Sequence, residues 1–310
     1  MWQFWVDRGG TFTDIVAKKP DGSLVSHKLL SENPEQYKDA AVQGIRDLLD
    51  LPAGAPIPDN TVSYVKMGTT VATNALLERA GDRTLYVTTR GFGDALRIGY
   101  QNRPKLFARH IVLPELLYER VIEADERMDA HGEVITPIDL EILKPQLKDA
   151  YDAGIRAVAI AFLHGYRYHE HELQVAALAR DIGFTQVSTS HQTSPLMKLV
   201  SRGDTTVVDA YLSPILSRYV NQVAEELGTT EDSVTRLMFM QSNGGLTDAG
   251  LFQGKDAILS GPAGGVVGMT RTAAMSGYTK LIGFDMGGTS TDVTHFDGEY
   301  ERSFETVVAG

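Results

Sequence analysis

The chain has 310 residues, 43% of them hydrophobic and 22% charged, which is enough for roughly two or three globular domains with ordinary cores. The formal net charge of −11 argues against a nucleic acid or an anionic membrane as a partner, because both require a basic protein surface. Cysteine is absent, which excludes disulfides, thiolate nucleophiles and thiolate metal sites.

The beginning of the chain predicts a three-stranded antiparallel meander followed by a helix. Aromatic and β-branched residues favour strands over residues 2–7, 11–19 and 23–30. The last two strands are joined by Pro20-Asp21-Gly22, a typical turn sequence, because proline presets φ and glycine tolerates a positive φ. Asn33 is expected to be the N-cap of the helix. One face of this helix is apolar: Ala41, Ile45, Leu48 and Leu49.

Residues 63–89 predict a β-α-β unit, with strands at 63–68 and 84–89 and a helix at 70–79. Its two strands are expected to be parallel and its crossover right-handed. Three antiparallel strands followed by two helix-linked parallel strands is the strand order of the ribonuclease H-like fold. The sequence therefore predicts an α/β domain of this kind at the start of the chain.

Helices and strands continue to alternate along the rest of the chain. Further helices are expected at 139–152, 169–182, 196–227 (interrupted near Ser213-Pro214) and 263–274. Further strands are expected at 119–129, 155–162, 185–190, 235–241, 280–285 and 291–297. This alternation is typical of α/β folds.

An internal repeat is the strongest signal in the sequence. Asp-Arg-Gly-Gly-Thr-Phe-Thr-Asp at residues 7–14 recurs as Asp-Met-Gly-Gly-Thr-Ser-Thr-Asp at residues 285–292, with six of eight positions identical. Both copies lie between two predicted strands, so each predicts a glycine turn in a β-hairpin. The pattern is neither a Walker A loop nor a dinucleotide fingerprint, because Gly-Lys-Ser/Thr and G-x-G-x-x-G are both missing.

The residue types of the repeat predict phosphate binding. Paired glycines let the backbone approach a phosphate closely and direct N–H groups at it, and threonine hydroxyls add donors. The residues expected to bind nucleotide phosphates are Gly9, Gly10, Thr11, Thr13, Gly287, Gly288, Thr289 and Thr291. Asp7 and Asp285 end their strands, where a carboxylate can hold Mg²⁺. The alternative for either copy is an ordinary tight turn with Asp and Thr as turn formers.

These hairpins resemble the phosphate motifs of the acetate kinase, sugar kinase, Hsp70 and actin superfamily. Within it, the whole chain resembles the N-terminal part of ATP-dependent 5-oxoprolinases and of hydantoinase A subunits. Six stretches carry the resemblance, in the family's order: residues 4–14, 67–79, 98–104, 241–246, 260–268 and 283–292. Arg8 and the stretch 98–104 are closer to oxoprolinases than to hydantoinases.

The resemblance implies an actin-like ATPase that opens a cyclic amide, converting 5-oxo-L-proline, ATP and water to L-glutamate, ADP and phosphate. The lactam oxygen is expected to be phosphorylated first, with ATP and Mg²⁺ held by the two hairpins and Asp7 and Asp285 as catalytic residues. Implied alternatives are a hydantoinase or ketone carboxylase A subunit, and a non-catalytic fragment that needs a partner.

The resemblance also implies a domain organisation. Residues 1–95 are expected to form a ribonuclease H-like unit, 96–195 an inserted α/β region, and 196–310 a helical segment with an incomplete second ribonuclease H-like unit. The adenosine pocket is expected further along than residue 310, so the chain alone is expected to bind ATP weakly. Expected partners are the missing C-terminal region, a B-type subunit or a second copy. The sequence carries neither a basic signal region nor an apolar run long enough to span a membrane, so a cytoplasmic location is expected.

Four weaker motifs in the sequence each allow a functional and a structural interpretation. Gly68-Thr69-Thr70 is an anion site at a helix start or a simple N-cap. Arg97 and Arg103 are ligands for a substrate carboxylate or solvated loop residues. Residues 260–265 line the nucleotide or allow close helix packing. His164, His169 and His171 lack the spacing of a helical metal site and are expected in a loop and a helix start.

Overall fold

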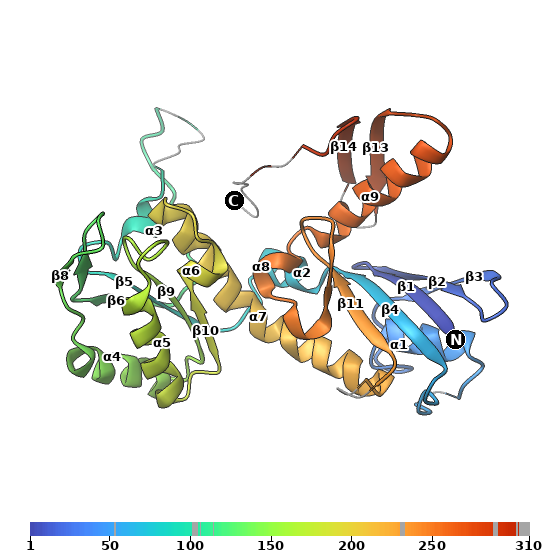
Figure 1. Cartoon of the computed structure of the whole chain (residues 1–310), viewed down its shortest axis with the longest axis horizontal. Coiled ribbons are helices and arrows are strands. Elements are labelled where there is room, and N and C mark those ends of the chain that lie inside the picture. The colour runs from blue at the N-terminus through green and yellow to red at the C-terminus, as the bar shows by residue number, and fades with distance from the viewer. Residues whose placement is uncertain are drawn as a thin grey trace. The chain divides into compact units, whose positions relative to one another are not determined.

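The structure is a computed structural model that describes residues 1–52, 54–100, 105, 107–113, 115–229, 233–287, 291–301 and 303. The chain forms two compact units (Figure 1). The first unit combines Met1–Ala75 with Leu216–Phe304, and the second contains Leu76–Ile215. Within the described part of the chain, every helix is too short or too polar to cross a membrane.

The first unit is built on a six-stranded mixed sheet in the order β12-β11-β4-β1-β2-β3. Its strands are β1 (Trp2–Arg8), β2 (Phe12–Lys18), β3 (Leu24–Leu30), β4 (Val62–Thr69), β11 (Arg236–Met240) and β12 (Leu246–Asp248). Strands β1, β2 and β3 pair antiparallel, as the meander predicted. Strand β4 is parallel to β1 on one side and to β11 on the other.

Helix α1 (Ala40–Leu48) packs on the face of this sheet to which β1 and β2 turn their buried residues. Phe4, Val6 and Ile15 alternate with exposed neighbours and are almost completely buried. Gly44 permits the close approach of helix and sheet, since a Cβ there would lie 2.3 Å from Ile15 Cδ1. Part of the core of the first unit therefore lies between α1 and the meander.

The helix start expected at Asn33 is wrong. The Asn33 carbonyl accepts hydrogen bonds from the N–H groups of Gln36 and Tyr37 (2.9 and 3.0 Å), which closes a single turn. Helix α1 begins later, where the Asp39 carboxylate accepts from Val42 N at 3.1 Å and serves as the N-cap. Both asparagine and aspartate are good caps, so composition alone did not separate the two positions.

The β-α-β unit expected over residues 63–89 is also wrong. Helix α2 (Val71–Leu77) follows β4, but the next strand, β5 (Thr84–Thr89), does not pair with β4. Every residue of β5 is buried, and the strand pairs on both sides with parallel partners in the second unit. The place beside β4 is taken by β11, from far along the chain.

The second unit contains a four-stranded parallel sheet in the order β10-β9-β5-β6. The other strands are β6 (Arg120–Ala124), β9 (Ala157–Ala161) and β10 (Gln186–Thr189). One face is covered by α4 (Leu140–Asp152) and α5 (Glu170–Ile182), with a core that includes Leu147, Ile160 and Val175. The other face packs Tyr86, Leu96 of α3 (Ala95–Ile98) and Val207 of α7 (Leu199–Leu227). The remaining elements are β7 (Arg127–Met128), β8 (Val134–Thr136) and α6 (Ser190–Thr193).

Helix α7 (Leu199–Leu227) is continuous, so the interruption expected near Ser213-Pro214 is wrong. Proline lacks only its own N–H, and a long helix can accommodate that loss by a local bend. The preceding Ser213 hydroxyl donates to Asp209 Oδ1 within the same helix at 3.1 Å. Buried residues on both sides of the proline, such as Leu212 and Leu216, hold the helix in place.

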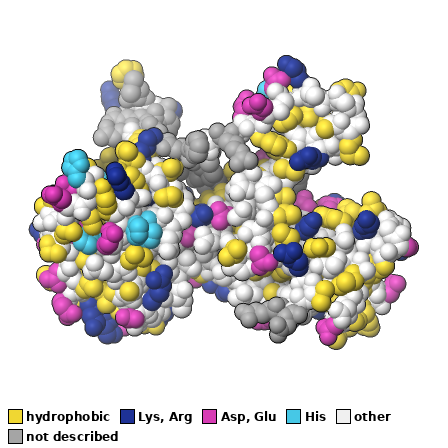
Figure 2. Space-filling model, viewed as in Figure 1, with side chains coloured by type: hydrophobic (Ala, Val, Ile, Leu, Met, Phe, Trp, Pro, Cys, Tyr) yellow, Lys and Arg dark blue, Asp and Glu magenta, His cyan; other side chains and the backbone are white. Residues whose placement is uncertain are grey.

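The end of the first unit contains two helices and a hairpin after the short 3₁₀ segment η1 (Ala249–Leu251). These are α8 (Gly254–Ala257), α9 (Ser260–Met275), β13 (Lys280–Met286) and β14 (Thr291–Asp297). One face of the hairpin packs against α9, where Gly283 approaches Met269. The opposite face exposes the apolar side chains of Ile282, Phe284, Met286 and Val293. Figure 2 shows apolar side chains on the surface of this lobe.

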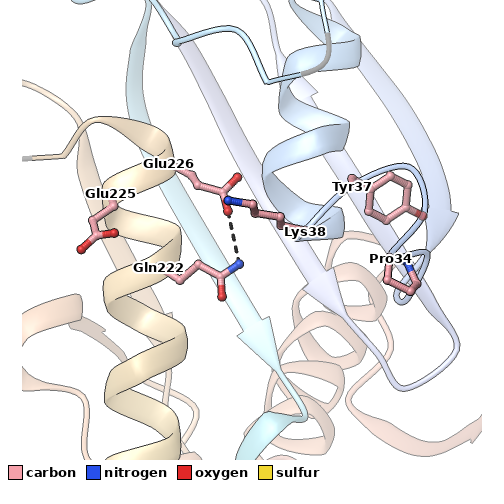
Figure 3. A pocket seen from close by; sticks show the side chains of 6 residues that line it. All are labelled: Pro34, Tyr37, Lys38, Gln222, Glu225 and Glu226. Carbon is pink, nitrogen blue, oxygen red and sulfur yellow. Dashed lines mark hydrogen bonds between the residues drawn. The ribbon is translucent and has the colours of Figure 1, made fainter.

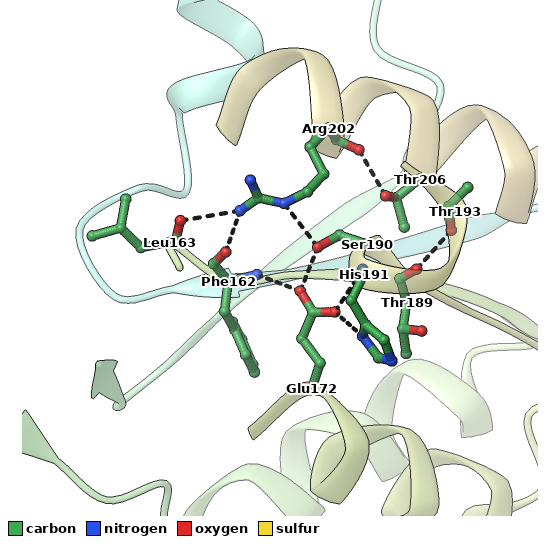
Figure 4. A network of polar contacts seen from close by, with 9 residues as sticks. All are labelled: Phe162, Leu163, Glu172, Thr189, Ser190, His191, Thr193, Arg202 and Thr206. Carbon is green, nitrogen blue, oxygen red and sulfur yellow. Dashed lines mark hydrogen bonds and ion pairs between the residues drawn. The ribbon is translucent and has the colours of Figure 1, made fainter. Parts of the chain in front are cut away.

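A buried polar network fixes the carboxyl ends of β9 and β10 in the second unit (Figure 4). The Glu172 carboxylate accepts hydrogen bonds from Phe162 N (3.1 Å), from the Ser190 hydroxyl and from His191 N and Nδ1 (3.1 and 2.6 Å). Arg202 is fully buried and uses all of its N–H groups. Its acceptors are Ser190 Oγ and the carbonyls of Phe162, Leu163, Leu196 and Met197.

The three neighbouring histidines do not converge on a metal. His171 is buried in α5 and contacts Glu126 Oε2 through Nδ1 at 2.7 Å. His169 precedes that helix and stacks on His191, with ring centroids 4.7 Å apart. Among the described residues, no group of three or more His, Asp or Glu side chains has the arrangement of a metal site.

Candidate phosphate-binding site

The first glycine turn joins β1 to β2 and exposes backbone donors. Gly9 N donates to Phe12 O at 3.1 Å and closes the turn, and a Cβ on Gly9 would lie 3.0 Å from that same carbonyl oxygen. Gly10 and Thr11 are exposed. Within the described residues, neither the Gly10 nor the Thr11 amide N–H has a hydrogen-bond partner. Consecutive backbone amides that are free on an exposed turn can donate hydrogen bonds to an anion.

Thr13 does not lie on this exposed surface. Its side chain is fully buried, and its hydroxyl lies 3.0 Å from Ser31 Oγ. Ser31 follows β3, and its own hydroxyl donates to the carbonyl of Gly9 at 2.6 Å. Its backbone N–H also donates to Thr11 O at 2.9 Å. The sequence did not single out Ser31, because it belongs to no motif and lies well outside the repeat.

Two aspartates face each other across the first hairpin. Asp7 and Asp14 are directly opposite in the register of β1 and β2. Asp14 pairs with Lys28 Nζ at 2.7 Å. Removal of water by the surrounding chain raises the pKa of Asp7, and the negative charges of Asp14 and Asp285 raise it further, while Lys28 lowers it by a smaller amount. The surroundings of Asp7 therefore disfavour its ionised form.

The second hairpin repeats the arrangement. Asp285 and Asp292 are directly opposite in the register of β13 and β14, as Asp7 and Asp14 are in the first copy. Thr291 pairs with Met286 and is exposed, and Gly287 is exposed at the end of β13. Gly288 and Thr289 lie outside the described residues. The two copies belong to the same unit, and the charge of Asp285 acts on Asp7.

The aspartates have the donor chemistry that Mg²⁺ prefers. Magnesium is usually held by one or two carboxylates, with water and substrate phosphates as its other ligands. Asp7 fits this requirement, because a cation beside it would offset both its desolvation and the repulsion from Asp14 and Asp285. The described residues form no cage of three ligands, so the fit is to a hydrated, phosphate-bound ion rather than to a purely protein site.

Behind the first turn lies a cluster that the sequence did not predict. Arg8 Nε lies 3.5 Å from Asp39 Oδ2, and its guanidinium lies over the ring of Tyr219, 5.2 Å from the centroid. Asp39 is buried and also caps α1. Burial raises the pKa of Tyr219, and the charge of Asp39 adds to this effect. The cluster links the residue next to the turn with the start of α1 and with α7.

Two of the weaker motifs, residues 68–70 and 260–265, contact each other beside the first glycine turn. Thr70 donates to the Arg8 carbonyl from both its N–H and its hydroxyl, at 3.2 and 3.3 Å. Thr69 Oγ1 accepts from Val71 N at 3.3 Å, which is the cap interpretation. The Ser260 hydroxyl donates to Thr69 O at 3.2 Å, so the start of α9 packs on the end of β4. These contacts give both segments a packing role.

The arginines suggested as ligands for a substrate carboxylate do not lie at the glycine turns in the described part of the chain. Arg97 is exposed on α3 in the second unit, and Arg103 lies outside the described residues. The hollow drawn in Figure 3 is lined by Pro34, Tyr37, Lys38, Gln222, Glu225 and Glu226. Gln222 and Glu226 are hydrogen-bonded to each other there at 3.2 Å. None of its lining residues belongs to either hairpin, so this hollow is not the candidate site.

Profiles of two related families together match nearly the whole chain. The family described as "Hydantoinase/oxoprolinase N-terminal region" matches residues 3–183. The family described as "Hydantoinase/oxoprolinase" matches residues 202–310. The first glycine hairpin lies in the first match and the second hairpin lies in the second.

Individual relatives agree with these profiles. The chain is 44% identical to "5-oxoprolinase 1" of Arabidopsis thaliana, over 99% of this chain and 26% of the relative. It is 42% identical to "5-oxoprolinase" of Saccharomyces cerevisiae, over 98% of this chain and 26% of the relative. The solved ATP-dependent caprolactamase from Pseudomonas jessenii superposes with a TM-score of 0.78 at 30% identity, over 94% of this chain and 43% of that chain. The chain thus spans about a quarter of the length of these curated relatives.

Proposed function

The chain belongs to the hydantoinase/oxoprolinase family, and from this we propose that it is the N-terminal, ATP-binding part of a 5-oxoprolinase. The observation that carries the proposal is the turn at residues 9–11, where the Gly10 and Thr11 amide N–H groups have no hydrogen-bond partner among the described residues. The turn directly follows the strand that ends with Asp7 and Arg8, and partial burial raises the pKa of the Asp7 carboxyl. The recurrence of the paired aspartates, Asp285 opposite Asp292, supports the binding of one nucleotide between two hairpins. The identity to 5-oxoprolinases favours this substrate over the alternatives.

We propose that the first unit contains a ribonuclease H-like domain of the actin-like ATPase kind. Its strand order, three antiparallel strands followed by the parallel pair β4 and β11, supports this assignment. In such open sheets, ligands bind outside the carboxyl ends of the parallel strands. The carboxyl ends of β1 and β4 are where Asp7, Arg8 and Thr69 lie.

In the proposed reaction, the lactam oxygen of 5-oxo-L-proline attacks the γ-phosphorus of ATP, and the bond to the oxygen that leaves on ADP breaks. One water then adds to the activated ring carbon, the C–N bond breaks, and the nitrogen takes up a proton. A further water releases phosphate, and the products are L-glutamate, ADP and phosphate. Such a phosphoryl transfer depends on positioning and on charge neutralisation more than on covalent protein chemistry.

The residues of this chain have distinct proposed roles in that reaction. The Gly10 and Thr11 amides donate to phosphate oxygens, and the exposed turn lets the nucleotide approach without displacing a side chain. Asp7 and Asp285 hold Mg²⁺ directly or through water. When bound, Mg²⁺ neutralises the charge of the phosphate oxygens. We place the remaining ring-opening machinery in a C-terminal region, a B-type subunit or a second copy.

The test is substrate-dependent ADP release by the full-length protein. 5-Oxo-L-proline, hydantoin, caprolactam and acetone with bicarbonate are compared at saturating Mg-ATP, with ATP alone as the control. The proposal predicts that 5-oxo-L-proline stimulates ADP release most strongly and is converted to glutamate in equal amount. Stimulation by one of the other compounds alone would reassign the substrate, and no stimulation by any of them would contradict the proposed catalytic function.

A further inference from the structure

The hydrogen bonds behind the first glycine turn determine the direction of two hydroxyl protons. Ser31 Oγ lies 2.6 Å from the Gly9 carbonyl oxygen, which can only accept, so the single Ser31 hydroxyl proton is used there. The Thr13 hydroxyl lies 3.0 Å from the same Ser31 oxygen. Because Ser31 has no second hydroxyl proton, Thr13 must be the donor in this contact. The Thr13 proton therefore points into the protein.

This assignment changes the role expected for Thr13. We propose that Thr13 and Ser31 are positioning residues, which hold the Gly9–Thr11 turn in the conformation that presents the Gly10 and Thr11 amides. The inference rests on the proposed ATP-binding function and adds a residue, Ser31, that lies outside the repeat. Ser31 donates two hydrogen bonds to carbonyl oxygens of the turn, one from its hydroxyl to Gly9 and one from its N–H to Thr11.

The physical reason lies in the two consecutive glycines. Glycine has the largest backbone freedom of any residue, so a Gly9-Gly10 turn would otherwise sample many conformations. Binding would then have to order the turn, which lowers affinity. Thr13 and Ser31 are both almost completely shielded from water, and buried hydrogen bonds of this kind hold their geometry. The turn is thus ordered before the nucleotide arrives.

The two copies of the repeat differ at this point. Thr13 in the first hairpin is fully buried, whereas its counterpart Thr291 in the second hairpin is exposed. The same residue type therefore has different surroundings in the two copies. Only in the first copy does a neighbouring strand end, that of β3, place a serine against the threonine, as far as the described residues show.

The test uses the full-length protein with four variants. Thr13→Val and Ser31→Ala remove one hydroxyl each, Thr13→Ser keeps the hydroxyl, and Ser26→Ala makes the same change at an exposed position of β3. The affinity for Mg-ATP is measured by titration calorimetry, with the KM values for ATP and for 5-oxo-L-proline. Thermal unfolding verifies that each variant is folded.

The positioning role predicts that Thr13→Val and Ser31→Ala each weaken ATP binding about tenfold and change the KM for 5-oxo-L-proline less than twofold. The double variant should lose no more than about the larger single loss, because the two hydroxyls act as one unit. Thr13→Ser and Ser26→Ala should bind ATP as the wild type does.

Three results would overturn the inference. A loss in Thr13→Val with none in Ser31→Ala would mean that Thr13 contacts phosphate directly. Equal losses in Thr13→Ser and Thr13→Val would mean that the methyl packing matters and the hydroxyl does not. Unchanged binding in both hydroxyl-deleting variants, with binding weakened in Asp7→Asn, would refute the positioning role alone. If Asp7→Asn also leaves ATP binding unchanged, the proposed function fails as well.

Discussion

Asp7 is useful to the candidate site in its ionised form, but that form destabilises the fold. Its carboxylate is partly shielded from water and lies opposite Asp14, and the charge of Asp285 acts on it too. These effects raise its pKa, so ionised Asp7 costs folding free energy. The cost is consistent with a residue kept for binding a cation, since active sites commonly hold groups whose pKa is shifted in this way.

The raised pKa of Asp7 sets the sign of a pH dependence. Between the ordinary aspartate pKa and the raised value, the folded state keeps a proton that the unfolded state has released, so the free energy of unfolding falls as pH rises through this interval. Asp7→Asn removes the charge. We expect the variant to unfold at a higher temperature than the wild type at neutral pH, with the difference vanishing at acidic pH.

Thermal unfolding at several pH values measures this difference. For a unit of this size, each kcal/mol corresponds to about 2–4 °C in Tm. Glu35→Gln, which alters an exposed carboxylate, is the control and should shift Tm little at any pH. A lower Tm in Asp7→Asn at neutral pH would show that the carboxylate stabilises the fold, contrary to the assignment.

At the scale of single elements, α5 is fixed by one buried carboxylate. Glu172 accepts hydrogen bonds from Phe162, which follows β9, and from Ser190 and His191 of α6, and it is almost completely buried (Figure 4). Each of these hydrogen-bond partners is a donor. An amide in its place would set an NH₂ group against those donors, and a buried polar group that loses its partner is costly.

Glu172→Gln is therefore expected to lower the free energy of unfolding of the second unit by about 1–3 kcal/mol. Glu170→Gln, at an exposed position of the same helix, is the matched control and should change it by less than about 0.5 kcal/mol. Denaturant titration of the three proteins gives both values. Equal stability of the two variants would mean that the network in Figure 4 contributes nothing beyond packing.

The elements also show what the sequence could and could not predict. The β1–β2–β3 meander and the two aspartate-bearing hairpins were predictable, because each depends on neighbouring residues and on turn chemistry. The pairing of β4 with β11 was not, because it joins residues that are far apart in the chain. No local pattern says which of two apolar strands, β5 or β11, is placed beside β4.

The candidate site was predictable to a similar extent. The repeat identified Asp7, Asp285 and the glycines, because phosphate chemistry limits which residue types can serve there. The repeat could not show that Thr13 faces inward, since that depends on Ser31 at the end of another strand. Arg8 with Asp39 and Tyr219 was missed for the same reason, because three separate elements bring those side chains together.

At the scale of the whole molecule, the described chain consists of two units with separate cores. Asp7 lies in the first unit and Glu172 in the second. Substitutions at distant positions with no shared partners usually have additive effects on stability. The double variant Asp7→Asn with Glu172→Gln should therefore change the free energy of unfolding by the sum of the single changes, to within about 0.5 kcal/mol. A larger deviation in denaturant titrations would show that the two units are coupled.

The central claim is that the two aspartate-bearing hairpins act together on the phosphates of one ATP. The most direct measurement is 5-oxo-L-proline-dependent ADP release by the full-length protein and its variants Asp7→Asn and Asp285→Asn, with Asp59→Asn as an exposed control. The account predicts that each hairpin variant loses at least about a hundredfold in turnover, as is typical when a group that stabilises transferring charge is removed, while the control keeps wild-type turnover. Wild-type turnover in either hairpin variant would contradict it.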